Sequence, residues 1–323
     1  MELKPEIIEK IKLLDQKYAA MGQDLNSYLE GLLYSDYLTY WNYIHLDTLL
    51  SLQSPITNIP DEEIFIMYHQ VTELYFKLCI HEYKQICNNA NLTADFLLAR
   101  VKRINRYFDA LALSFDIMSE GMEKEQFLKF RMSLLPASGF QSAQYRMIEV
   151  YTTPFTNLMH KDHRGKYPEV PADEQITEMF EHIYWKEGAT ELATGKKTLT
   201  LKQFEHKYAD QIIDLAKEYK NKNLWLRYKQ LPEADQKNPK LIEALHHMDV
   251  NVNVNWPLAH YKTAVAYLHR NPEDIAATGG TNWQKYLPPR FQKRIFFPIL
   301  WTEQEKEEWG KSWVRKHVFH QGA

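Results

Sequence analysis

Apolar side chains recur every three or four residues along most of this chain, the spacing that gathers them on one face of an α-helix. The clearest example begins after Thr93, whose hydroxyl is suited to cap a helix, and continues to about Ser119. Its apolar face consists of Phe96, Leu97, Val101, Ile104, Phe108, Leu111 and Phe115. The pattern therefore predicts a long core helix between these two residues.

The same spacing predicts helices through most of the remaining sequence. They cover residues 4–20, 62–88, 123–134, 142–151, 173–186, 201–228 and 239–269, with a terminal helix after Pro298. Asp61 is the expected N-cap of the helix at 62–88. Pro257 lies inside the helix at 239–269, and we expect a kink or break there because proline has no N–H to donate.

Taken together, the pattern predicts an all-α fold in which long helices form the core. Residues 250–255 alternate valine and asparagine with the period of a strand. Six residues cannot build a sheet alone, so we expect this stretch to be helical or irregular. Prolines and glycines make the stretch from about 155 to 200 less regular. We predict one domain over residues 1–323, with that stretch as a central insertion.

Composition narrows the class of protein. The 11 glycines are too few to suggest a Gly-rich nucleotide-binding fold, and a net charge of −3 argues against a nucleic-acid partner. The sequence has no run of 18 apolar residues and begins with a charged segment, so neither a membrane span nor a signal peptide is expected. Cys79 and Cys87 lie about two helical turns apart, too far for a disulfide. A cytoplasmic location is expected.

Several of the 13 histidines are candidates for chemistry. His160 and His163 form an H-x-x-H in a polar loop, and a solvated loop is favoured over a metal site because two imidazoles are an incomplete ligand set. His246 and His247 are adjacent, so their side chains point in different directions on a helix. Neither pair makes a convincing metal site.

Three further residues have two readings each. His69 lies in an apolar helical stretch with Glu73 one turn later, so it is either a core histidine or a catalytic one. His260 follows Trp256 and Pro257 and is equally ambiguous. Arg131 lies on an apolar helix before a Ser-Gly turn, where it either clamps a carboxylate or pairs with a carboxylate of its own helix.

Four segments, taken in order, resemble the motifs of one family. The first is Tyr40-Trp41-Asn42-Tyr43-Ile44-His45-Leu46-Asp47, followed by Leu50 and Gln53. The second is Phe65-Ile66-Met67-Tyr68-His69-Gln70, followed by Glu73 and Leu74. The third is Phe127 and Arg131, then Ser138-Gly139-Phe140-Gln141-Ser142 and Gln144-Tyr145-Arg146. The fourth is Trp256 and His260, then Thr278-Gly279-Gly280.

The family that these segments resemble is tryptophan 2,3-dioxygenase, with a match over about residues 37–150 and 245–285 and no clear match over 152–240. The resemblance implies a b-type haem with His260 as the proximal iron ligand and His69 on the distal side, near the substrate indole N–H. It also implies that Arg131 grips the substrate carboxylate. The remaining implied roles are Phe65 and Phe127 in the indole pocket, Thr278 at the ammonium or carboxylate, and Ser138, Gly139 and Trp256 at the haem. Tyr40, Tyr43 and Ile44 match residues that reach the site of a neighbouring subunit in a homotetramer.

The activity that the resemblance implies is opening of the indole ring of L-tryptophan with O2, giving N-formyl-L-kynurenine. The loop at 277–283 departs from the family pattern, because Asn282 and Trp283 replace small residues and the spacing from His260 to Thr278 is longer. Two alternatives therefore stay open. One is a haem oxygenase of the same scaffold acting on a modified indole, and the other is a non-catalytic haem- or tryptophan-binding protein.

Overall fold

The computed structural model describes residues 3–36, 38–134, 141–190, 194–268 and 293–311. Helices dominate these residues, and their β structure is limited to two isolated bridges, Met159–Ile183 and Thr190–Lys197. The all-α fold class is confirmed. Within the described ranges, no helix is both long enough and apolar enough to cross a membrane.

Contacts divide the chain into two compact units, Met1–Ser54 and Pro55–Ala323, each of which is described by itself. The first unit contains α1 (Pro5–Ala20), α2 (Leu25–Leu33), α3 (Tyr40–Tyr43) and α4 (Leu46–Leu49). Asp24 caps α2 by accepting hydrogen bonds from the backbone N–H groups of Asn26 and Ser27. Among its described side chains, only Leu25 is buried. The unit therefore has very little core of its own. The prediction of a single domain stays a prediction.

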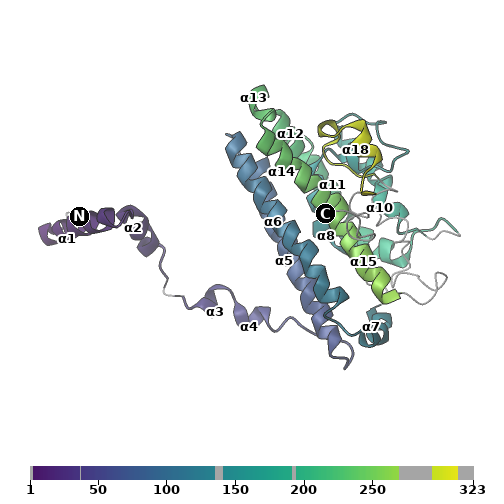
Figure 1. The fold of residues 1–323 in the computed structure, drawn as a ribbon, viewed down its shortest axis with the longest axis horizontal. Coiled ribbons are helices and arrows are strands. Elements are labelled where there is room, and N and C mark those ends of the chain that lie inside the picture. The colour runs from purple at the N-terminus through teal and green to yellow at the C-terminus, as the bar shows by residue number, and fades with distance from the viewer. Residues whose placement is uncertain (1–2, 37, 135–140, 191–193, 269–292, 312–323) are drawn as a thin grey trace. The chain divides into compact units, whose positions relative to one another are not determined.

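The second unit is built on two long helices that run side by side, α5 (Asp61–Cys87) and α6 (Ala94–Ser119) (Figure 1). Thr93 caps α6 by accepting from the Phe96 N–H at 3.2 Å, as predicted. The predicted apolar face of α6 is largely buried, with Leu97, Ile104 and Leu111 fully enclosed. On the other side of α6 lie α14 (Pro239–Val250) and α15 (Trp256–Leu268).

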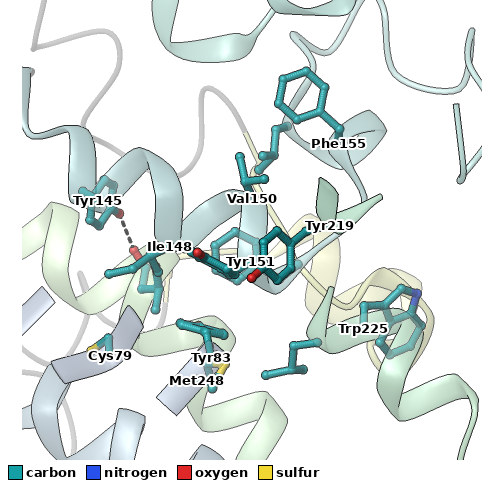
Figure 2. Packing of buried hydrophobic residues seen from close by; sticks show 14 of the residues in the cluster. Cys79, Tyr83, Tyr145, Ile148, Val150, Tyr151, Phe155, Tyr219, Trp225 and Met248 are labelled. Carbon is teal, nitrogen blue, oxygen red and sulfur yellow. Dashed lines mark hydrogen bonds between the residues drawn. The ribbon is translucent and has the colours of Figure 1, made fainter. Parts of the chain in front are cut away.

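Aromatic and sulfur-containing side chains fill the core that α5 forms with α8 (Ala143–Thr152), α11 (Leu199–Tyr219) and α12 (Leu224–Lys229) (Figure 2). The ring of Tyr83 stacks on Tyr151 at a centroid distance of 6.0 Å. Its hydroxyl accepts from Thr152, so the buried polar atom is satisfied. Cys79 and Cys87 are buried free thiols, which confirms that they form no disulfide.

The start of α5 differs from the prediction. Pro60 is the residue before the helix, and Asp61 is its first helical residue, so the assignment of Asp61 as N-cap is wrong. The Asp61 carboxylate instead accepts the backbone N–H of Glu123 at 2.5 Å, which fixes the start of α7 (Lys124–Phe130) against α5. Glu62 accepts the N–H groups of Ile56 and Thr57 and holds the chain that leads into the helix.

Two predicted helices are each divided. The stretch at 173–186 forms α9 (Asp173–Glu181) and α10 (Tyr184–Glu187), because Ile183 between them is extended. The stretch at 201–228 is interrupted before α12, whose N-cap is the side chain of Asn223. Short elements complete the unit: 3₁₀ turns at Arg131–Leu134, Phe155–Leu158 and Pro298–Leu300, and the helices α13 (Glu233–Gln236) and α18 (Glu303–Glu307).

No break occurs at Pro257. Instead, α14 continues into α15 through one segment of π-helix, Asn251–Asn255, which we call the π-turn. A π-turn forms i→i+5 hydrogen bonds and widens the helix, so it accommodates a proline that lacks the usual donor. The alternating asparagines and valines therefore belong to a helix, in agreement with the expectation that they form no strand.

Candidate functional site

A second apolar cluster lies apart from the main core and consists mainly of aromatic rings. Its buried members are Tyr68, Phe115, Met118, Met122, Phe130 and Tyr267, and Phe65, Phe127, Trp256 and Ala259 are among the partly buried residues around them. These residues come from four helices, α5, α6, α7 and α15, except Met122, which lies between α6 and α7. Phe65 lies 6.2 Å from Phe127 and 5.7 Å from Phe130, measured between ring centroids. The two phenylalanines predicted to wall a pocket are therefore neighbours.

His69 stands on α5 at the edge of this cluster. Its Nδ1 lies 2.7 Å from the carbonyl oxygen of Phe65, and its ring centroid lies 4.1 Å from that residue's ring. A carbonyl only accepts, so Nδ1 carries the proton and Nε2 keeps a free lone pair. Burial lowers the pKa of His69, although the bond to Phe65 and the charge of Glu73 act in the opposite direction. The side chain is therefore a neutral imidazole with an acceptor nitrogen.

His260 is the second histidine of the cluster and stands on α15. Its ring stacks on Phe115 of α6 with centroids 5.7 Å apart and an angle of 17° between the planes. Burial, with a smaller effect of the nearby His69, lowers its pKa to about 4. No hydrogen bond to the ring is present within the described residues. At neutral pH the side chain is an uncharged imidazole, the form that binds a metal.

Arg131 begins the 3₁₀ turn that follows α7, one turn beyond Phe127. Burial lowers the pKa of its guanidinium, which nevertheless remains charged. Arg131 directly follows Phe130, a buried member of the aromatic cluster, so a cation lies next to the cluster in the chain. Ser138, Gly139 and Thr278 lie outside the described residues.

Gln144 connects the end of the third motif to α5. Its side-chain amide donates to the backbone carbonyl of Glu73 at 2.9 Å and to the Glu73 carboxylate at 2.8 Å. Ser142 caps α8 two residues earlier by accepting from the Tyr145 N–H. The third motif is therefore attached to α5 at Glu73, one helical turn beyond His69. Sequence reasoning gave Gln144 no role, although it was part of the quoted motif.

Trp256 begins α15, one turn before His260. Its ring lies 4.6 Å from that of Phe115 and 5.6 Å from that of Phe76, so it packs against both apolar clusters. Phe115 and Tyr267 were not predicted as site residues. Phe115 was visible only as one member of an apolar stripe. Tyr267 lies seven residues after His260, a spacing that puts both on the same helix face.

Other predicted residues belong to other parts of the chain. Tyr40, Tyr43 and Ile44 belong to the first unit, where the two tyrosines are 70% and 73% exposed. In the H-x-x-H loop, the ring of His163 stacks on His182 at 4.0 Å. Within the residues that the structure describes, no group of three or more His, Cys, Asp or Glu side chains could hold a metal ion.

Comparison with known proteins decides the family. The family model of tryptophan 2,3-dioxygenase matches residues 30–230. A protein named tryptophan 2,3-dioxygenase from Bacillus thuringiensis strain Al Hakam is 30% identical over 290 residues, covering 84% of this chain and 94% of that protein. The chain belongs to the tryptophan 2,3-dioxygenase family. Another member, from Ruegeria sp. strain TM1040, is 40% identical over 121 residues, which cover 36% of this chain and 42% of that one.

The family resemblance is thereby confirmed, with one correction. The match to tryptophan 2,3-dioxygenase includes residues 152–230, where sequence reasoning found no clear match. This region supplies core residues such as Leu201, Phe204 and Trp225 rather than side chains of the aromatic cluster. The helical spacing of apolar residues in this region is common to many helical proteins, so it does not distinguish one family from another.

Proposed function

We propose that the chain is a haem-dependent dioxygenase that opens the indole ring of L-tryptophan with O2 and gives N-formyl-L-kynurenine. The observation that carries this proposal is the pair of neutral histidines, His69 and His260, at one aromatic cluster with Arg131 at its edge. The name shared by the relatives supports the same activity. A protein that only carries haem would need His260 alone, so the presence of His69 and Arg131 as well favours catalysis.

The residues present fit a b-type haem. His260 offers an uncharged imidazole that stacks on Phe115, which in turn contacts Trp256, and aromatic rings of this kind suit the faces of a porphyrin. His260 would hold the haem iron, and Trp256 would contact the haem. Ser138 and Gly139 would lie beside the haem and the substrate. When bound, ferrous haem supplies the activation of O2, both of whose atoms enter the product at C2 and C3 of the indole.

The protein residues bind and orient the substrate. Phe65 and Phe127 would contact the indole faces, and aromatic rings suit an aromatic ligand. Arg131 would grip the carboxylate through the two parallel hydrogen bonds that a guanidinium forms, and Thr278 would meet the ammonium or the carboxylate. Together these contacts hold the indole C2–C3 bond in one place and exclude water from it.

His69 has a defined part in this arrangement. Because its Nδ1 donates to Phe65, its Nε2 can accept the indole N–H. The lowered pKa keeps that nitrogen unprotonated at neutral pH. An indole N–H is a very weak acid, so we assign His69 to orientation of the substrate rather than to complete removal of its proton.

We further propose a homotetramer in which Tyr40, Tyr43 and Ile44 reach the site of a neighbouring subunit. Apolar exposure supports association, because α5 presents a face of four exposed residues, Met67, Val71, Leu74 and Leu78. Their spacing places them on one side of the helix. We also propose a cytoplasmic location, with which two buried free thiols are in keeping.

One experiment tests the activity. The purified protein is loaded with haem, reduced and given L-tryptophan in air, and the absorbance of N-formylkynurenine is followed. Product is expected with the wild type, whereas His260→Ala should lose haem binding. Turnover of a substituted indole without turnover of tryptophan would support the alternative oxygenase, and haem binding without any product would support a binding protein.

A further inference from the structure

The helix that carries His260 changes its hydrogen-bond pattern shortly before that residue. The π-turn at Asn251–Asn255 inserts the equivalent of one extra residue into the helix. If the turn reverted to α-helical geometry, every later side chain would rotate by about 100° around the helix axis relative to α14. The direction of His260 therefore depends on the π-turn being kept.

One side chain of the π-turn is held from two sides. The amide nitrogen of Asn253 donates to the carboxylate of Asp249 at 2.6 Å, and its amide oxygen accepts from Arg294. All three residues are buried. Arg294 also donates to the carbonyl of Val252 in the same turn at 3.2 Å.

Both partners of Asn253 are themselves fixed. The Asp249 carboxylate accepts the backbone N–H groups of Phe296 and Phe297 at 2.9 and 3.1 Å, and the indole N–H of Trp301 at 3.0 Å. Arg294 donates to Tyr145 at 2.8 Å and pairs with the fully buried Glu149. Residues 294–301 are thus attached to this part of the helix in two ways, through Asp249 and through Arg294. Asn253 forms a hydrogen bond with each of these two residues.

We infer that Asn253 is a positioning residue for His260: by bonding to Asp249 and Arg294 it holds the π-turn, and the π-turn sets the direction of the imidazole. This inference rests on the proposed function only in giving His260 a haem to bind. Asn255 provides a contrast within the same turn. It donates to Asn251 at 2.7 Å, is half-buried and forms no hydrogen bond to Asp249 or Arg294.

The test compares Asn253→Ala with Asn255→Ala as the matched control. Haem is titrated into the haem-free proteins, and the affinity and the Soret band of the ferric and ferrous forms are measured alongside thermal melting. We expect Asn253→Ala to bind haem about tenfold more weakly and with a shifted Soret band, whereas Asn255→Ala keeps the wild-type values. Asn253→Ser serves as a milder variant if the alanine variant does not fold.

Two results would overturn the inference. One is an Asn253→Ala protein that melts earlier but binds haem with wild-type affinity and spectrum, which would make the residue merely structural. The other is an equal change in both variants. Amide hydrogen exchange of residues 256–261 in the haem-free proteins gives a readout that needs no haem: it should be faster in Asn253→Ala than in the control. If the wild type binds no haem, the proposed function fails, and this exchange measurement alone decides the inference.

Discussion

Gln144 bonds to both the backbone and the side chain of Glu73, with its amide nitrogen 2.9 Å from the carbonyl oxygen and 2.8 Å from the carboxylate. This pair joins α8 to α5 one helical turn beyond His69. It holds the Glu73 carboxylate at the place from which its charge raises the pKa of His69 against the larger effect of burial. Two motifs that lie far apart in the sequence are therefore linked through Glu73, which Gln144 contacts and whose charge acts on His69.

Replacing Glu73 with glutamine should lower the pKa of His69 further, because it removes a negative charge that favours the protonated ring. NMR titration of the histidine ring signals, assigned through a His69→Gln variant, measures the change. Glu63→Gln, on the exposed side of the same helix, is the control. An unchanged or raised pKa in Glu73→Gln would show that the carboxylate does not act on His69.

Much of this site could be predicted from local sequence, and the rest depends on tertiary contacts. The stripe that ends at Phe115 predicted α6 and its buried face, because helical spacing is a local property. Nothing local shows that Phe115 stacks on His260, which lies on another helix. Likewise, Thr93 was predicted as a helix cap, whereas Asp61 failed as one because its carboxylate accepts the backbone N–H of Glu123, which is distant in the sequence.

The π-turn marks another limit. Pro257 signalled a disturbance of the helix, but the sequence did not indicate its form, which depends on the buried partners Asp249 and Arg294. Arg294 follows the π-turn by about forty residues and donates to Asn253 from another segment of the chain. A pairing of this kind arises from the fold and has no periodic pattern in the sequence.

Arg131→Lys should weaken the binding of L-tryptophan, because an ammonium cannot form the paired hydrogen bonds of a guanidinium. We expect KM to rise about 10- to 100-fold with a smaller change in kcat, the range that corresponds to a lost charge-assisted hydrogen bond. Steady-state kinetics measures it. The affinity for tryptamine, which has no carboxylate, should not change, and Lys129→Gln on the exposed side of α7 should leave KM unaltered. An equal loss for tryptamine would remove Arg131 from the carboxylate end.

Asp249 makes the stability of the fold depend on pH. Burial raises the pKa of its carboxyl from 3.8 to about 6, although four hydrogen-bond donors oppose the shift. The folded state therefore holds the proton more tightly than the unfolded state. The stability that this group contributes is fully present below about pH 4 and is lost as the pH rises through about 6.

The comparison with Asp249→Asn, which cannot titrate, isolates this effect. The free energy of unfolding of the wild type, minus that of the variant, should fall by about 3 kcal/mol between pH 4 and pH 7. Urea denaturation at several pH values measures it, with Asp95→Asn on the exposed side of α6 as control. A difference that stays constant or increases with pH would contradict the raised pKa.

The exposed face of α5 should be needed for assembly. Val71 and Leu78 are 49% and 44% exposed on one side of the helix, and burying apolar surface of this kind stabilises an interface. The double change Val71→Lys and Leu78→Lys places two charges there, which a dry interface between subunits cannot accommodate. Size-exclusion chromatography with light scattering should show species smaller than the wild-type assembly. Leu199→Lys, at an apolar residue of α11 that is 59% exposed, is the matched control and should leave the assembly intact.

If Tyr40, Tyr43 and Ile44 complete a neighbouring site, tryptophan turnover will fall together with assembly. An assembly of unchanged size in the double variant would place the interface elsewhere.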